Sequence, residues 1–255
     1  MDRYVKSGAA FILLLCAISC NEIALKTGHY ELNETCALAE GRTDSISLST
    51  RVEYPKSGIR RQAREKICEG IARLCYGTGG NDIETAARQW ADSCIAEYRK
   101  EGNELMMYLS DNGDSEPVAA LSWERSLNGY IAGDHGDIIS YIVSTYDFSG
   151  GAHGSSAELA FNFNRKSGEI IDEDDIFTEG SAVELSKLLS ARLQSAFDEE
   201  AYNSLFVKDI EPNGNFIVSD EGMTYIYGQY EIGPYSLGII ELDLSWDELE
   251  SIFAR

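Results

Sequence analysis

One apolar segment constrains the fold of this chain more than any other. Residues 137–148 are rich in Ile, Val and Tyr, and such a run is typical of a strand covered on both faces of its sheet. Glycine-rich turns precede it at 133–137 and follow it at 149–156. Strands joined by short turns pair antiparallel. The segment therefore predicts the central strand of a largely antiparallel sheet.

Alternating apolar residues predict further strands. The clearest spans 45–54, and Pro55 should end it. Other strands are expected at 104–110, at 118–132 with an interruption near Asn128 and Gly129, at 158–164, on both sides of the turn 219–222, and at 238–244.

Helical spacing predicts two helices after the first strand, at 57–76 and from about residue 82 to about residue 100. A glycine-rich turn separates them, so we expect an antiparallel helical hairpin. Three capping boxes, in which Glu follows the cap residue by three positions, indicate helix starts. They are Asn81 with Glu84, Ser181 with Glu184, and Ser245 with Glu248. The expected fold is α+β, a mostly antiparallel sheet packed by helices, with an N-terminal strand plus the helical hairpin.

The first twenty residues have the pattern of an export signal. Arg3 and Lys6 precede an apolar run at 9–18, which as a helix of about 15 Å is too short to span a bilayer. The following Ser19 and Cys20 resemble the end of a bacterial lipoprotein signal, although Ala stands where Leu is usual. This resemblance implies that Cys20 carries the lipid. The alternative is a plain secretory signal cut nearby, and either signal implies an exported protein.

Four regions follow from these patterns. We expect a signal peptide at 1–19, a tether at 20–43, a strand and hairpin subdomain at 44–102, and an α+β domain at 103–255. No later run reaches membrane length, so membrane attachment is expected only through the N-terminal lipid. The expected location is the cell envelope, on the outer membrane, facing the periplasm or the cell surface.

The chain is strongly acidic, with a formal net charge of −22 at pH 7. Loss of residues 1–19 leaves 19 basic against 42 acidic residues, a net charge of −23. Such a charge repels nucleic acid and anionic membranes, and it attracts a cationic partner less strongly as salt increases. The alternative is that the charge only keeps an exported protein soluble.

Export favours disulfides among the four cysteines that follow Cys20. Cys68 and Cys75 are about 10 Å apart along one helix, beyond the reach of a single disulfide. In an antiparallel hairpin Cys94 lies closer to Cys68 than to Cys75. We therefore predict the pairs Cys68 with Cys94 and Cys36 with Cys75. The alternative is four buried free thiols.

The turn DFSGGAHGSS at 147–156 contains one of the three histidines of the chain, His153. Gly150, Gly151 and Gly154 favour a strand connection of special backbone geometry. A catalytic His153 would need a partner, yet the segment has neither a nucleophile-elbow pattern nor a phosphate-loop ending. We interpret the segment as a turn and retain its histidine and glycines as candidate contact residues.

No cofactor or metal site is predicted. His29, His135 and His153 lie far apart and form no H-x-x-x-H pattern. The acidic run 172–175 does not fit a calcium loop because Phe177 occupies the sixth position, where glycine is needed.

The other distinctive segment is YIYGQYEIGPYSLG at 225–238. Its four tyrosines suit a recognition surface, because tyrosine offers apolar area and a polar tip at low entropic cost. Tyr230, Glu231 and Tyr235 are the candidate contact residues. The alternative is that these tyrosines only pack on a sheet.

Four motifs in order resemble an extracytoplasmic domain of unassigned activity: SGGAHG at 149–154, SGEIIDEDDIF at 167–177, Asn-Phe at 215–216, and YEIGPYSLG at 230–238. That domain occurs in the lysozyme-sensing anti-sigma factor of Gram-positive bacteria, beside the catalytic domain of a peptidoglycan deacetylase, and in lipoproteins of the Bacteroides group. The likeness covers about residues 120–253. The sigma-binding segment, membrane span and metal-binding catalytic domain of those relatives have no counterpart here, so the resemblance implies the extracellular binding portion.

These observations predict an envelope lipoprotein that is a non-catalytic binding module. The expected ligand is a cationic protein such as lysozyme, or a peptidoglycan fragment of the cell wall. The alternatives are an envelope hydrolase using His153 as general base and a structural component of a larger envelope assembly.

Overall fold

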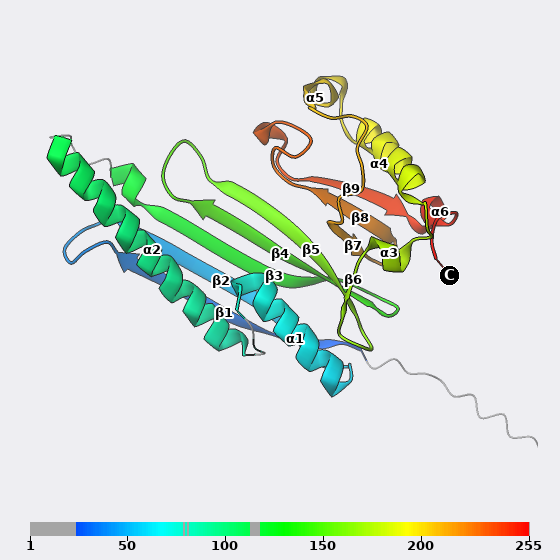
Figure 1. Cartoon of the computed structure of the whole chain (residues 1–255), viewed down its shortest axis with the longest axis horizontal. Coiled ribbons are helices and arrows are strands. Elements are labelled where there is room, and N and C mark those ends of the chain that lie inside the picture. Colours follow the sequence, from blue (N-terminus) through cyan, green and yellow to red (C-terminus); the bar gives the residue numbers. More distant parts are fainter. Residues whose placement is uncertain (1–23, 79, 81, 113–117, 255) are drawn as a thin grey trace, which may run out of the picture.

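The computed structural model describes residues 24–78, 80, 82–112 and 118–254, and Figure 1 shows their arrangement. The large sheet contains, in spatial order, β1 (Lys26–Ala37), β2 (Ser45–Ser57), β3 (Trp123–His135), β4 (Ile138–Phe148), β5 (Ser155–Asn164) and β6 (Ile170–Ile171). The small sheet contains β7 (Phe216–Val218), β8 (Gly222–Tyr227) and β9 (Ile240–Ser245). The helices are α1 (Arg61–Tyr76), α2 (Ile83–Asn112), α3 (Glu173–Ile176), α4 (Ala182–Ala196), α5 (Glu199–Ser204) and α6 (Trp246–Leu249), with the 3-10 turns η1 (Val118–Leu121) and η2 (Tyr235–Leu237).

These elements form four layers. Helices α1 and α2 cover one face of the large sheet, the small sheet packs on part of the other face, and α4 covers the far side of the small sheet (Figure 1). Every strand pair is antiparallel except β2 with β3. The predicted α+β class with a mostly antiparallel sheet is confirmed.

The predicted central strand is β4. It pairs with β3 on one side and β5 on the other, and Ile139, Tyr141, Ile142 and Val143 are buried. Burial on both faces is what the apolar run requires. Neighbouring predictions differ in detail: β2 continues through Pro55, and β3 continues through Gly129, where a Cβ would clash with the Tyr141 hydroxyl.

The expected tether at 20–43 is wrong for residues 26–37, which form edge strand β1. Tyr30, Leu32 and Cys36 alternate with exposed residues and pack towards α1 and α2. This is the period-two pattern of a strand, hidden in a polar composition. Cys20 and the predicted signal segment lie outside the described residues.

The two predicted helices exist, but they are not antiparallel. Tyr76, at the end of α1, packs its ring 6.0 Å from that of Trp90, in the third turn of α2. Cys68, halfway along α1, instead lies at the same pocket as Ile83 at the start of α2. The chain therefore returns beside α1 before α2 begins, and both helices run in the same direction along the sheet (Figure 1).

Helix α2 also continues through 104–110, where a strand was expected. Leu105, Met106 and Leu109 keep the helical spacing on its packed face, and Gly102 permits close contact with Leu38. The expected division at 102/103 thus falls inside α2, and the large sheet takes strands from both sides of it. In the described chain, no helix is long and apolar enough to cross a membrane.

The predicted disulfides are absent: the four cysteines within the described residues are all free thiols. The Cys68 thiol lies against the Pro55 carbonyl of β2, 3.7 Å from it. Cys75 faces the sheet beside Tyr141, and burial raises the pKa of its thiol to about 12. The pairing assumed antiparallel helices, so their shared direction removes the basis for bonding Cys68 to Cys94.

Two capping predictions can be compared with the structure. Ser245 and Glu248 form the predicted capping box of α6. Ser181 precedes α4 but its side chain accepts no capping hydrogen bond, because its backbone is already helical at φ −67°, ψ −20°. Asn81 lies outside the described residues.

Buried polar groups join the two sheets. The Ser140 hydroxyl of β4 donates to the side-chain oxygen Oδ1 of Asn162 in β5 at 2.6 Å and accepts from the backbone N–H of Val218 in β7 at 2.8 Å. The Asn162 side-chain amide donates to the Phe216 carbonyl at 2.9 Å. Gly133 lies so close to the Val218 carbonyl that a Cβ there would clash. The Ser140 and Asn162 side chains are at most 2% exposed, so water cannot satisfy these polar groups if the hydrogen bonds are broken.

We predict that Asn162→Leu lowers the free energy of unfolding by about 3 kcal/mol, because it leaves the Phe216 carbonyl and the Ser140 hydroxyl buried with fewer partners. Urea denaturation monitored by circular dichroism measures the loss. Asn128→Leu, at an exposed position of β3, is the matched control and should change stability by less than about 0.5 kcal/mol. Equal losses for the two variants would contradict the role given to Asn162.

Candidate functional site

Two loops far apart in sequence meet at the surface. DFSGGAHGSS connects β4 to β5, and the YEIGPYSLG segment connects β8 to β9 (Figure 1). The His153 and Tyr235 rings are stacked with centroids 4.1 Å apart, and Tyr230 lies 5.6 Å from Tyr235. We call these three residues the aromatic junction. The structure thus brings together three of the candidate contact residues.

The glycines of the first loop permit backbone conformations and close contacts that other residues would not. Gly150 and Gly151 have φ of 93° and 106°, and Gly150 abuts the backbone of Ala120. Such φ angles strain any residue with a Cβ. Gly154 is buried against the ring of Tyr146, which leaves no space for a Cβ. The interpretation of this segment as a glycine-shaped turn agrees with the geometry.

His153 is exposed, and its ring contacts a carbonyl and another ring. Its Nδ1 lies 3.0 Å from the Gly154 carbonyl oxygen, which also accepts a hydrogen bond from the Tyr235 hydroxyl at 2.9 Å. Within the described residues, no carboxylate or serine side chain forms a hydrogen bond with His153. A general base needs such a partner or a substrate cleft, so this geometry does not support the hydrolase hypothesis.

The side-chain amides of Gln229, in the second loop, and of Asn215, just before β7, bond the backbone of β5. Ser156 donates its backbone N–H to Gln229 Oε1 at 2.9 Å. Asn215 accepts from the Ala160 backbone amide at 2.6 Å and donates to the Glu158 carbonyl at 2.9 Å. These bonds satisfy part of the β5 edge that β6 does not reach, and covered edges resist unwanted pairing. They also fix the distance between the two loops.

Tyr230 is held in an unusual conformation. Among the described residues it alone, apart from glycines, has positive φ, at 65°. Glu231 accepts from the Gly228 backbone at 2.6 Å and from Asn213 at 2.9 Å, so its carboxylate shapes the turn instead of facing the aromatic junction. The Tyr230 side chain is 56% exposed. Strain that presents an aromatic ring to solvent is typical of functional positions.

The carboxylates of Glu158 on β5 and Glu241 on β9 lie close enough to repel each other. Burial, and then the charges of Glu158 and Asp243, raise the pKa of Glu241. Burial, and then Glu158 and Glu241, raise the pKa of Tyr130, which is 39% exposed. Glu158 lies two residues beyond Ser156 on β5, and Ser156 bonds Gln229 of the segment that leads to Tyr230 and Tyr235. A cation placed there would relieve their mutual repulsion.

Exposed apolar side chains border the same loop. Phe206 and Val207 are 61% and 44% exposed, and both backbone amides donate to the Ile232 carbonyl, at 2.9 and 3.4 Å. Together with the aromatic junction they give the β8–β9 loop an apolar surface of the kind that marks interaction sites.

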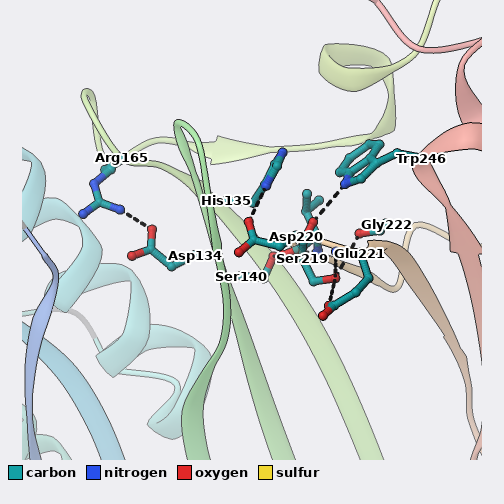
Figure 2. A network of polar contacts seen from close by, with 10 residues as sticks. Asp134, His135, Ser140, Arg165, Ser219, Asp220, Glu221, Gly222 and Trp246 are labelled. Atoms are coloured by element: carbon teal, nitrogen blue, oxygen red, sulfur yellow. Dashed lines mark hydrogen bonds and ion pairs between the residues drawn. The ribbon is translucent and has the colours of Figure 1, made fainter. Parts of the chain in front are cut away.

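A second polar cluster lies at the other end of β4, where the β3–β4 turn meets the β7–β8 turn (Figure 2). His135 Nδ1 is 2.8 Å from Asp220, and its ring stacks on Trp246 at 5.2 Å. The Trp246 indole donates to the Ser219 carbonyl at 3.1 Å. Each polar group in this cluster has a partner from a neighbouring element, so its evident role is to join the sheets and α6.

The sequence predicted no metal site. Among the described residues, no group of three or more His, Cys, Asp or Glu side chains is arranged to hold a metal ion. Local sequence patterns did not predict that Gln229 would bond Ser156, that Phe206 would border the β8–β9 loop, or that Glu158 and Glu241 would lie close to each other. Their proximity depends on how the sheets pack, which no local pattern encodes. Asn215 belongs to one of the four motifs, but its hydrogen bonds to β5 were not predicted.

Comparison with known proteins places the chain in a structural class. Residues 174–247 match the model of a family described as a protein of unknown function, DUF3298. This segment contains Asn215, Gln229, Tyr230 and Tyr235, and the family model therefore covers one of the two loops of the junction. A search of curated proteins found no match.

Two solved structures are similar over nearly the whole chain. A DUF3298 family member from Bacteroides fragilis has a TM-score of 0.81 at 23% identity, covering 92% of this chain and 96% of that chain. A DUF3298 family protein from Pseudomonas aeruginosa has a TM-score of 0.64 at 17% identity, covering 91% of this chain and 96% of that chain. The fold is therefore that of solved DUF3298 structures.

We predict that Tyr230→Gly is more stable than Tyr230→Ala by about 1 kcal/mol, because only glycine adopts positive φ without strain. Thermal or urea unfolding measures the difference. The matched control is Tyr108, 64% exposed within α2, where the order should reverse, with Gly less stable than Ala by about 1 kcal/mol. The same order at both positions would contradict a strained Tyr230.

Proposed function

We propose that this protein is an exported, lipid-anchored binding module of the cell envelope whose aromatic junction takes a cationic protein. The observation that carries the proposal is the meeting of His153, Tyr235 and Tyr230 at the surface from two separate loops. Exposed, preorganised aromatic side chains are the residues that most often supply binding energy at protein interfaces.

Charge favours a cationic partner over other partners. Residues 172–250, which include the β8–β9 loop, contain 19 acidic and three basic residues. Glu158 and Glu241 add mutually repelling carboxylates on β5 and β9, the strands that follow the two loops. A basic protein would be steered to this surface and would offset the repulsion between those carboxylates.

Lysozyme is the cationic protein that the sequence resemblance suggests, through the lysozyme-sensing domain that shares the four motifs. The predicted export signal and Cys20 support a position in the envelope, where such a partner would be met. A peptidoglycan fragment is the other candidate ligand, since stacked rings offer flat apolar faces beside polar groups.

We expect a chain beginning at Asn21 to bind lysozyme at low salt and to bind it more weakly at high salt, because screening reduces the attraction between opposite charges. This chain keeps every buried core residue, from Leu38 to Ile252. Tyr230→Ala should weaken binding by about tenfold, as loss of an exposed aromatic anchor does. Isothermal titration calorimetry measures both effects.

The matched control is Tyr108→Ala, which removes a tyrosine of similar exposure from α2 and should leave the affinity unchanged. Absence of lysozyme binding even at low salt would overturn the cationic-protein proposal. Binding of a soluble muropeptide, with the same dependence on Tyr230, would assign the junction to cell-wall fragments instead.

A further inference from the structure

Basic residues gather at one end of this acidic protein. Residues 56–66, KSGIRRQAREK, contain five basic side chains and one acidic side chain, whereas the whole chain has a net charge of −22. Lys26 adds a sixth basic residue from the neighbouring strand. We call Lys26, Lys56, Arg60, Arg61 and Arg64 the basic end.

Strand pairing and hydrogen bonds hold the basic end together. Lys26 pairs with Ser57 where β1 meets β2, so it lies next to Lys56. Arg64, in the first turn of α1, donates to the Lys56 carbonyl at 2.7 Å. Figure 1 shows the start of α1 beside the start of β1, where the described chain begins.

Most of these charges are available to a partner. Lys26, Lys56, Arg60 and Arg61 are exposed. Arg61 lies 3.7 Å from Glu65, and over the described residues the other four basic-end side chains have no carboxylate within salt-bridge distance. Unpaired cations in a cluster are costly through mutual repulsion, and an anionic surface would remove that cost.

The membrane-directed part of the sequence lies within reach of the basic end. Cys20 precedes Lys26 by six residues, which span at most about 20 Å when extended. The apolar run 9–18 directly precedes Cys20. Whichever of these two holds the chain at a bilayer, the basic end is the part of the folded protein that is tethered closest to it.

The aromatic junction lies at the other end of β5. This strand runs from Ser155, next to the junction, to Asn164, and ten residues of strand span about 30 Å. The turn that follows it contacts α1, since Glu169 bonds Lys66 and Gly168 abuts Ala63. The basic end and the junction are therefore well separated compared with a screening length of about 8 Å at physiological salt.

We propose that the basic end docks on an anionic phospholipid surface and so directs the aromatic junction away from the bilayer. The inference builds on the proposed envelope anchoring and adds an orientation to it. Net charge alone predicts repulsion from such a surface. Because the screening length is short, however, the protein charges nearest the surface determine the interaction, and the total charge does not.

The test is co-sedimentation of the chain beginning at Asn21 with vesicles of phosphatidylcholine alone or mixed with phosphatidylglycerol, at physiological salt. We expect binding only to the mixed vesicles. Replacing Lys56, Arg60 and Arg61 with Gln should lower the partition coefficient on the order of a hundredfold, because each basic residue near an anionic surface contributes about fivefold.

The matched control replaces Arg88, Lys100 and Lys187 with Gln, three exposed basic residues elsewhere, and should bind as the unchanged chain does. No binding to mixed vesicles, equal losses in both triple variants, or binding of a DNA duplex without vesicle binding would each overturn the proposal. Lysozyme binding should survive in the basic-end variant, so failure of docking and failure of the proposed function are distinguishable. Circular dichroism verifies that both variants fold.

Discussion

The contact between the two sheets is the constraint on which the rest of this structure depends. Ser140 and Asn162 lie on the face of the large sheet that the small sheet covers, and their hydrogen bonds to Val218 and Phe216 connect β4 and β5 to β7. Buried polar groups of this kind are costly unless fully bonded, so they permit one arrangement of the sheets. That arrangement places the β4–β5 turn against the β8–β9 loop, and the aromatic junction results from it.

A large part of the fold follows from local patterns. Three features are each determined by residues within a few positions of one another: the apolar strand β4, the glycine-rich turn after it, and the Ser245 capping box. Local rules work here because burial on both faces, positive φ and capping are properties of short segments.

What local patterns could not predict depends on contacts between distant segments. The direction of α2 relative to α1 is set by packing on the sheet, as the contact of Tyr76 with Trp90 shows. The polar composition of β1 predicted a tether, and this segment forms a strand because it pairs with β2. The stacking of His153 on Tyr235 joins residues 82 positions apart, and the positive φ of Tyr230 is imposed by the turn that Glu231 stabilises.

Charge and fold together suggest how the molecule is used. The aromatic junction adjoins the start of β5, Glu158 on that strand and Glu241 on β9 repel each other, and unpaired basic side chains adjoin the far end of β5. An envelope protein so built would hold its basic end at a bilayer and offer its acidic, aromatic surface to a cationic protein. The His135 cluster strengthens the joint between the sheets through the contacts of His135 with Asp220 and of Trp246 with the Ser219 carbonyl.

Hydrogen–deuterium exchange of the protein alone and mixed with lysozyme tests the central claim most directly, because it locates the contact without altering the chain. The account predicts slower amide exchange in residues 149–156 and 228–238 when lysozyme is present, with little change in α2. Slower exchange confined to other segments, such as β1 or α2, with both loops unchanged, would contradict it.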